Sequence, residues 1–234
     1  MTSHTPPTII AFASPKGGVG KSTSCLSLAG ALAASGHTVT VIDFDQTETL
    51  WRWYSTNDAA RAIPNLTVEK GPTENLGAFI QTIWVERTGY VLIDLAGALT
   101  DQMLRLAVFA NLTITPAKLS EPDILEAKRL STQLAEIATR INKPIAHRVL
   151  LNEVPSMLPH FQTYILSQID QLGLSRFETQ IHYRAAYPES FMSGQTPHFA
   201  DNKRSTIAKA TEELDALVNE VLSIVHPNQQ SLAA

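Results

Sequence analysis

Three glycines and two lysines lie close together near the start of the chain, in the segment ASPKGGVGKST at residues 13–23. The segment nearly matches the pattern G-x-x-x-x-G-K-[ST], in which backbone N–H groups and a lysine bind phosphates and a hydroxyl group binds Mg²⁺. Pro15 replaces the first glycine of that pattern, and Lys16 is an additional lysine, five residues before Lys21. The segment therefore predicts a triphosphate site with one more cation than the pattern requires.

The residues on either side of this segment predict the structure that a phosphate site needs. A β-branched run at 8–14 predicts a strand, and residues 21–35 predict a helix whose first backbone N–H groups would face phosphate oxygens. Lys21 is expected to reach the β- and γ-phosphates, and Ser22 to bind Mg²⁺. The predicted nucleotide-binding residues of this loop are Lys16, Gly17, Gly18, Val19, Gly20, Lys21, Ser22 and Thr23.

The rest of the chain alternates short β-branched runs with longer helical patterns. Strands are predicted at residues 8–14, 38–44, 66–70, 90–95, 112–117 and 145–154, with a weaker candidate at 177–183. Helices are predicted at about residues 21–35, 46–58, 74–87, 100–110, 121–141, 159–172 and 201–225. This alternation indicates an α/β fold, a doubly wound and mostly parallel sheet with helices on both faces. We expect one domain over residues 1–225 and a frayed tail over 226–234.

The composition restricts the class of protein. The 234-residue chain has a net charge of -4, so binding to nucleic acid would need a local basic patch. Cys25 is the only cysteine, which excludes internal disulfides and cysteine-held clusters. The start of the chain has no secretory pattern, and no apolar run is long enough to span a membrane. We therefore expect a soluble, cytoplasmic protein.

The segment at 15–23, PKGGVGKST, resembles the deviant Walker A loop of the ParA/MinD superfamily, which are P-loop NTPases of the SIMIBI type. The resemblance implies that Lys16 reaches across a dimer interface to the nucleotide of the other subunit, much as an arginine finger does. A lysine in a solvated loop is the alternative. The resemblance further implies ATP and Mg²⁺ as cofactors and an ATP-dependent homodimer.

Two acidic segments are similar to motifs of the same superfamily. VIDFD at 41–45 resembles the D-x-D-P-Q motif, although Gln46 follows Asp45 without the usual proline. This implies that Asp45 orients the attacking water and that Asp43 lies nearer the Mg²⁺ shell. YVLID at 90–94 has the form of a Walker B strand, whose Asp94 would hold Mg²⁺ through water. The resemblance thus implies catalytic roles for Lys16, Lys21 and Asp45, and metal-binding roles for Ser22, Asp43 and Asp94. A polar strand end is the alternative for Asp43 and Asp45, and a buried strand that ends in a structural aspartate is the alternative for Asp94.

The resemblance continues past the nucleotide motifs. Residues 181–194 are similar to the late segment of small plasmid ParA proteins, and residues 113–123 to their mid-chain strand and helix start. The resemblance therefore covers about residues 8–225. Asn152 sits where relatives contact adenine, and a strand-end asparagine that forms a turn is the alternative.

The last predicted helix is the place to look for a membrane or DNA surface. Its apolar stripe is expected to pack on the domain, because the glutamates of its polar side would be repelled by anionic lipid. Lys203, Arg204, Lys209 and Arg184 are candidate DNA contacts, and solvated surface cations are the alternative. Trp51 and Trp53 are either core aromatics or, if exposed, anchors for a partner.

Together these features predict a ParA-like ATPase that forms an ATP-dependent sandwich dimer, binds DNA nonspecifically and drives plasmid or chromosome partition. A small centromere-binding or adaptor protein would stimulate hydrolysis, and the ATP-bound form would associate with the nucleoid. One alternative is a ParA-like positioner of another cargo, such as a conjugative-transfer complex, a protein assembly or a cellulose-synthesis apparatus. Another is a metabolic P-loop enzyme, against which Lys16 argues.

Overall fold

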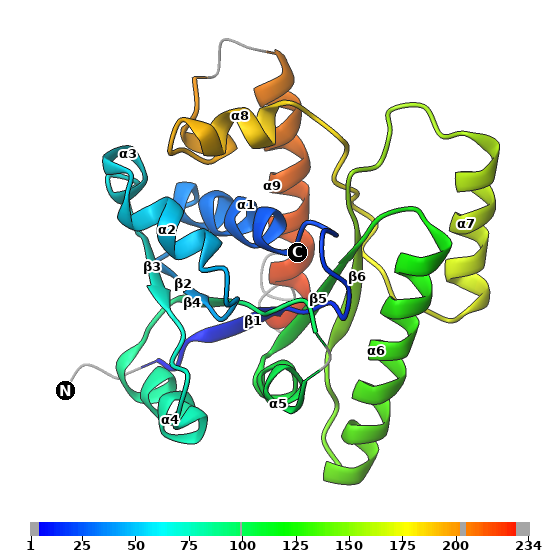
Figure 1. Ribbon diagram of the computed structural model, residues 1–234, viewed down its shortest axis with the longest axis horizontal. Helices are drawn as coiled ribbons and strands as arrows, with labels where there is room; N and C mark the ends of the chain where they lie inside the picture. The colour runs from blue at the N-terminus through cyan, green and yellow to red at the C-terminus, as the bar shows by residue number, and fades with distance from the viewer. Residues whose placement is uncertain (1–4, 99, 202–204, 228–234) are drawn as a thin grey trace.

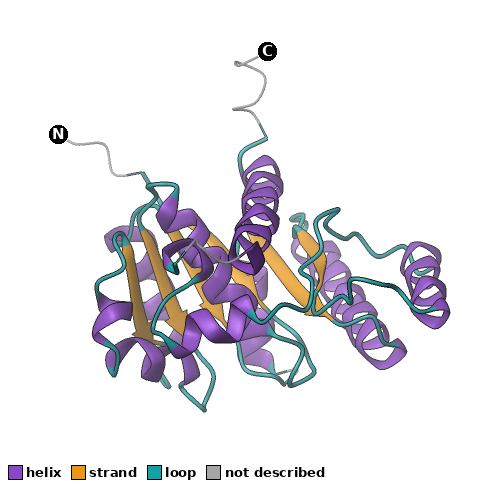
Figure 2. Ribbon diagram, turned by 90° about the horizontal axis from the view of Figure 1, so that it is seen from above, coloured by secondary structure: helices purple, strands orange, loops and turns teal. Residues whose placement is uncertain are grey.

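The computed structural model describes residues 5–98, 100–201 and 205–227. Within these residues, six parallel strands form one sheet in the order β3-β2-β4-β1-β5-β6. The strands are β1 (Thr8–Phe12), β2 (Val39–Asp43), β3 (Leu66–Lys70), β4 (Tyr90–Asp94), β5 (Leu112–Ala117) and β6 (His147–Leu151). They lie side by side between two helical layers (Figure 2). The predicted parallel α/β fold is confirmed.

Helices cover both faces of the sheet, with α1 and α9 on one side and α4, α5 and α6 on the other (Figure 1). The helices are α1 (Lys21–Ala34), α2 (Thr49–Ser55), α3 (Asp58–Arg61), α4 (Leu76–Glu86), α5 (Asp101–Phe109), α6 (Glu121–Ile141), α7 (His160–Gln171), α8 (Ala186–Met192) and α9 (Ser205–Val225), with a 3-10 turn η1 (Pro197–Phe199).

The core follows from the alternation of side chains along each strand. On β1, Ile10 and Phe12 pack toward α1 and α9, whereas Ile9 and Ala11 pack toward α4 and α5. All four side chains are fully buried. A strand that is covered on both faces must be apolar throughout, and this explains the uninterrupted runs in the sequence.

The order of the strands brings the functional loops together. All carboxyl ends of parallel strands lie at one edge of a sheet, and ligands bind where the direction of winding reverses. β1 lies between β4 and β5, so the loop that follows β1 leaves the sheet at such a reversal. The loops after β2 and β4 begin at the same edge, since Asp43 and Asp94, the last residues of these strands, are register partners.

Two predicted elements differ in the structure. The helix expected at 46–58 begins only at Thr49, because residues 45–48 form a loop whose hydrogen bonds run to Asp43 and Asp45. The strand expected at 177–183 is wrong. That segment makes one isolated bridge, Val154 with His182. Backbone carbonyls of β6 and Val154 accept the N–H groups of Phe177, Ile181 and Tyr183. Glutamates of α9 accept those of Glu178, Thr179 and His182, so no regular ladder forms. The short helix α8 was not predicted.

The C-terminal helix packs on the domain, as predicted. Its apolar stripe is buried against α1 and the sheet, and Leu222 is partly buried. The buried residues are Ile207, Ala210, Leu214, Leu217, Val218 and Val221. Among the helices of the described residues, none combines the length and apolar character needed to cross a bilayer. Of the tail predicted to fray, His226 lies 3.2 Å (Nε2) from the hydroxyl of Tyr90, and residues 228–234 lie outside the described part.

A buried histidine makes the stability of the fold depend on pH. His147 on β6 is 8% exposed, and its Nε2 lies 2.8 Å from the Thr115 hydroxyl. Burial, together with the charge of Arg148, lowers its pKa from 6.5 to about 4. The unfolded chain therefore takes up a proton between pH 6.5 and 4 that the folded chain does not, so acid destabilises the fold.

We expect the free energy of unfolding to fall by about 3 kcal/mol from this group as the pH is lowered from 6.5 to 4. His147→Gln, which cannot titrate, should lose that part of the slope in urea unfolding measured across this pH range. His160→Gln, at the exposed start of α7, is the control and should keep the slope. Identical slopes for wild type and His147→Gln would contradict the assignment.

Candidate functional site

The loop between β1 and α1 forms the centre of the site. Gly18 and Gly20 adopt positive φ angles of 74° and 90°, and no side chain caps the start of α1. The first N–H groups of a helix lack intrahelical partners, and here they remain available to an anion. The structure thus brings the predicted residues 16–23 together in one loop with the geometry that phosphate binding needs, which we call the phosphate loop.

Lys21 is buried behind this loop, and its side chain lies among acidic groups. Its residue is 7% exposed, and its Nζ donates a 3.3 Å hydrogen bond to the carbonyl oxygen of Lys16. Burial lowers the pKa of Lys21, while the charges of Asp94 and Asp45 act in the opposite direction. A Cβ at Gly97 would lie 3.1 Å from this Nζ and 3.2 Å from the Cα of Gly17, so a larger residue would crowd the contact between the loop after β4 and the phosphate loop.

Asp94 is a buried carboxylate in need of a partner. It is fully buried, and neither of its oxygens has a hydrogen-bond partner of normal geometry among the described residues. Burial raises its pKa to about 7, although the nearby Ser22 hydroxyl lowers it. Such an oxygen pair beside a serine hydroxyl suits Mg²⁺, which prefers oxygen ligands and keeps several waters. Ser22 and Asp94 therefore fit the predicted metal-binding role.

Asp43 is placed differently from Asp94, although the two are register partners. Its Oδ1 accepts the N–H of Asp45 at 3.0 Å, and its Oδ2 accepts those of Leu50 and Trp51 at 2.9 and 3.0 Å. Burial nevertheless raises its pKa. These bonds fix the loop before α2, so the structure gives Asp43 a capping role, and its place near Mg²⁺ stays a prediction.

Asp45 lies in that loop, close enough to Lys21 for its charge to act on the pKa of that lysine. Its Oδ1 accepts the backbone N–H and the hydroxyl of Thr47, at 2.9 and 2.8 Å. Together with Gly97 it lines a cleft of about 580 Å³ between the loops after β2, β3 and β4. Lys70, which sequence reasoning did not single out, lies in this cleft and pairs with Glu48 at 2.9 Å. Asp45 can thus contact a ligand bound next to Lys21.

Lys16 points away from Lys21, toward the start of α6. Its Nζ forms an ion pair with Asp123, and the Lys16 side chain is 42% exposed whereas that of Asp123 is 2% exposed. Asp123 also accepts the N–H of Lys118 at 3.0 Å. The two lysines of the loop therefore have separate environments: Lys21 is buried, and Lys16 lies at the surface.

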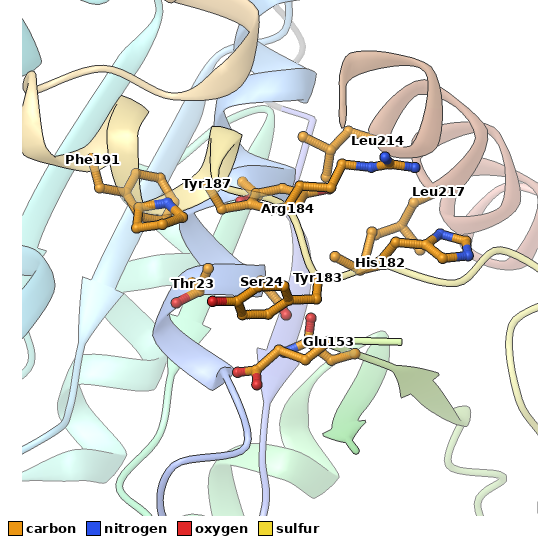
Figure 3. A pocket seen from close by; sticks show the side chains of 14 residues that line it. Thr23, Ser24, Glu153, His182, Tyr183, Arg184, Tyr187, Phe191, Leu214 and Leu217 are labelled. Carbon is orange, nitrogen blue, oxygen red and sulfur yellow. The ribbon is translucent and has the colours of Figure 1, made fainter. Parts of the chain in front are cut away.

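A cavity of about 240 Å³ lies on the other side of the phosphate loop (Figure 3). Asn152, at the end of β6, is 3% exposed and donates from Nδ2 to the carbonyl oxygen of Val19 at 2.9 Å. A Cβ at Gly20 would overlap this amide. Ser24 and Ser27 of α1 also line the cavity, and their buried hydroxyl oxygens have no partner among the described residues. The cavity thus offers polar atoms to a ligand beside the phosphate loop.

The candidate DNA contacts are not gathered in one place by the described residues. The Arg184 guanidinium is bound by Glu213, and the hydrogen bond between them raises the pKa of Arg184. Lys209 is exposed on α9, while Lys203 and Arg204 lie outside the described residues. Trp53 is partly buried and donates to the Phe191 carbonyl oxygen at 2.8 Å, whereas Lys70 lies over the ring of Trp51 at 5.9 Å.

Comparison with known proteins agrees with this geometry. Residues 10–197 match the family described as CbiA, the CobQ/CobB/MinD/ParA nucleotide binding domain. The chain is 28% identical to the protein ParA of Rhizobium radiobacter over 211 residues, which cover 89% of this chain and 93% of that protein. It is 29% identical to the protein virC1 of the same organism over 153 residues, 63% of this chain and 64% of that protein.

Solved structures share the fold at lower identity. The septum site-determining protein MinD of Pyrococcus horikoshii, complexed with Mg-ADP, has a TM-score of 0.69 at 16% identity, covering 94% of this chain and 98% of that one. A candidate plasmid partition protein of Borrelia burgdorferi bound to AMPPNP has a TM-score of 0.68 at 17% identity, covering 92% and 99%.

Replacement of Asp94 and of Asp43 by asparagine should change the free energy of unfolding in opposite directions. Asp94→Asn removes an unpartnered buried charge, so at pH 8 the free energy of unfolding of the nucleotide-free protein should rise by about 1–3 kcal/mol. Asp43→Asn is the matched control. It replaces an oxygen that accepts backbone N–H groups and should lower stability by a similar amount. Urea unfolding measures both.

The stability gained from ADP and Mg²⁺ tests the metal-binding role of Asp94. Wild type should gain more stability from ADP with Mg²⁺ than from ADP with EDTA, and Asp94→Asn should lose this difference. A destabilised Asp94→Asn protein, or one that keeps the full Mg²⁺ effect, would contradict the role given to Asp94.

Proposed function

Since the chain belongs to the CobQ/CobB/MinD/ParA nucleotide-binding family and is similar to ParA, we propose that it is an ATPase that dimerises around two ATP·Mg²⁺ and drives the partition of DNA. The observation that carries this proposal is the pair of lysines in one phosphate loop. Lys21 is buried and is available to the phosphates of the chain's own nucleotide, whereas Lys16 is exposed. An exposed cation at this place can act on a nucleotide held by a second copy of the chain.

The proposed nucleotide contacts use groups of the loop and of the neighbouring strand ends. The N–H groups of the loop and Lys21 hold the phosphates, and Asp45 orients the attacking water. Ser22 and Asp94 would hold Mg²⁺, which would supply positive charge to neutralise the charge that develops on the phosphates during transfer. Asn152 uses its amide nitrogen on Val19, so its oxygen is left to accept a hydrogen from the amino group of adenine.

A nucleotide-dependent dimer requires Lys16 to leave Asp123. In the single chain that ion pair holds the lysine at the surface. The phosphates of a partner's nucleotide carry more charge than one carboxylate, so they can compete for the ammonium group. We propose that this exchange makes dimerisation depend on ATP, and that the dimer works in the cytoplasm, on nucleoid DNA, with an adaptor protein that stimulates hydrolysis.

The cleft beside Asp45 is the one observation that favours a second candidate, a metabolic P-loop enzyme whose acceptor substrate would bind there. Such an enzyme would not turn over ATP without its acceptor. Steady ATP hydrolysis by the purified protein, with DNA as the only addition, would exclude this candidate.

The two lysines should be separable by substitution. Lys21→Ala should weaken Mg²⁺·ATP binding by about 10- to 100-fold, because it removes a buried charged donor to the phosphates. Lys16→Ala should bind ATP as a monomer but fail to dimerise with a nonhydrolysable analogue, as measured by sedimentation. Normal dimerisation and hydrolysis by Lys16→Ala would show that Lys16 does not act in trans.

DNA binding should belong to the ATP dimer and depend on salt. Wild type with a nonhydrolysable analogue should bind unrelated duplexes, and with ADP it should bind weakly. Asp45→Ala should hydrolyse ATP about 100-fold more slowly and so stay on DNA with ATP itself. Lys203→Ala/Arg204→Ala should flatten the slope of log affinity against log salt by about 3.6, if each residue meets one phosphate per protomer.

Arg140→Ala/Lys143→Ala is the matched control for the lost charge. These cations lie at the end of α6, which Figure 1 shows at the opposite end of the molecule from the start of α9. The control should keep the slope of wild type. Equal DNA binding with ADP and with the ATP analogue would overturn the switch, and no DNA binding in any state would favour another cargo.

A further inference from the structure

Glu213 of the C-terminal helix accepts an unusual number of hydrogen bonds from one neighbouring segment. The donors are His182 Nδ1 at 2.8 Å, His182 N at 3.4 Å, the Arg184 guanidinium (Nε at 3.1 Å, with a second contact from its terminal nitrogen) and the Tyr187 hydroxyl at 3.3 Å. The Glu213 side chain is only 13% exposed. One carboxylate thus fixes three side chains of residues 182–187.

The same three side chains line the cavity beside the phosphate loop. Figure 3 shows His182 and Arg184 extending toward the helix that carries Leu214 and Leu217, with Ser24 of α1 on the opposite side. Glu213 is not among the residues that line the cavity. It therefore shapes the wall from behind, through residues that it holds in place.

The protonation states of Arg184 and Tyr187 are fixed by Glu213 and by burial. The hydrogen bond to Glu213 raises the pKa of Arg184, and burial together with the Glu213 charge raises that of Tyr187. Arg184 is therefore charged and Tyr187 is a neutral donor. Removal of the carboxylate would leave a guanidinium and a hydroxyl without their acceptor, so the segment would have to rearrange.

We propose that Glu213 is a positioning residue for the base of the nucleotide; this inference rests on the proposed ATP site. It holds residues 182–187 as one wall of the pocket that receives the nucleoside, opposite Ser24, Ser27 and Asn152. The C-terminal helix then contributes to nucleotide affinity without touching the nucleotide.

The chain supplies a matched control on the same helix. Glu220 also accepts hydrogen bonds from the segment, from the N–H groups of Glu178 and Thr179 at 2.9 and 2.7 Å and from the Thr179 hydroxyl. None of these three residues lines the cavity. Glu220 therefore anchors the same segment but none of the residues that line the cavity. Its substitution shows what the loss of such an anchor does when the cavity wall keeps its own contacts.

The test compares ADP with inorganic triphosphate, each with Mg²⁺, by calorimetry on the full chain. Glu213→Ala should weaken ADP binding by about 10-fold, because it removes the charged acceptor that holds the His182, Arg184 and Tyr187 side chains in place. It should leave triphosphate binding unchanged, because that ligand has no base. Glu213→Gln keeps one acceptor oxygen and should lose less. Glu220→Ala should keep both affinities.

Each result decides the proposal. It is overturned if Glu213→Ala binds ADP like wild type, if triphosphate binding falls as much as ADP binding, or if Glu220→Ala reproduces the effect. If Glu213→Ala does not fold, the ratio of the two affinities in Glu213→Gln carries the same test. Wild type that binds triphosphate and ADP equally would overturn the nucleoside pocket, and wild type that binds neither would overturn the proposed function itself.

Discussion

The buried charges at the carboxyl edge of the sheet are the constraint on which the rest of the structure depends. Lys21 and Asp94 lie below the surface beside an uncapped helix start, and the oxygens of Asp94 have no normal hydrogen-bond partner among the described residues. Such charges are unfavourable beside an apolar sheet unless a ligand pairs with them or forms hydrogen bonds to them. The surrounding core must hold them in place, and it does so with β1, whose side chains are buried on both faces.

The two lysines of the loop show how position decides the role of one residue type. Lys21 is held inside by the strand and helix that flank the loop, where a fixed cation can meet phosphates without moving. Lys16 is 42% exposed, and a single carboxylate retains it. A charge that can change partners suits a switch between a single chain and a dimer, and a buried one does not.

The C-terminal helix joins the core to the nucleotide side. Its apolar stripe packs on α1, the helix that starts at the phosphate loop. Two glutamates of its polar side, Glu213 and Glu220, hold the segment that borders the cavity. The same helix therefore packs on the core and holds a wall of the cavity in place.

The sequence alone determined the parts that depend on local order. The phosphate loop, the strands that end at Asp43 and Asp94 and the helix at 121–141 follow from spacing and periodicity, which act over a few residues. Tertiary structure decided what each polar side chain meets. Asp43 and Asp94 end neighbouring strands in the same way, yet backbone groups of the following loop bind only Asp43. Lys16 meets Asp123, and Arg184 meets Glu213, across 107 and 29 residues of chain. Such partners depend on packing between elements that are distant in the sequence, and a local sequence pattern does not predict that packing.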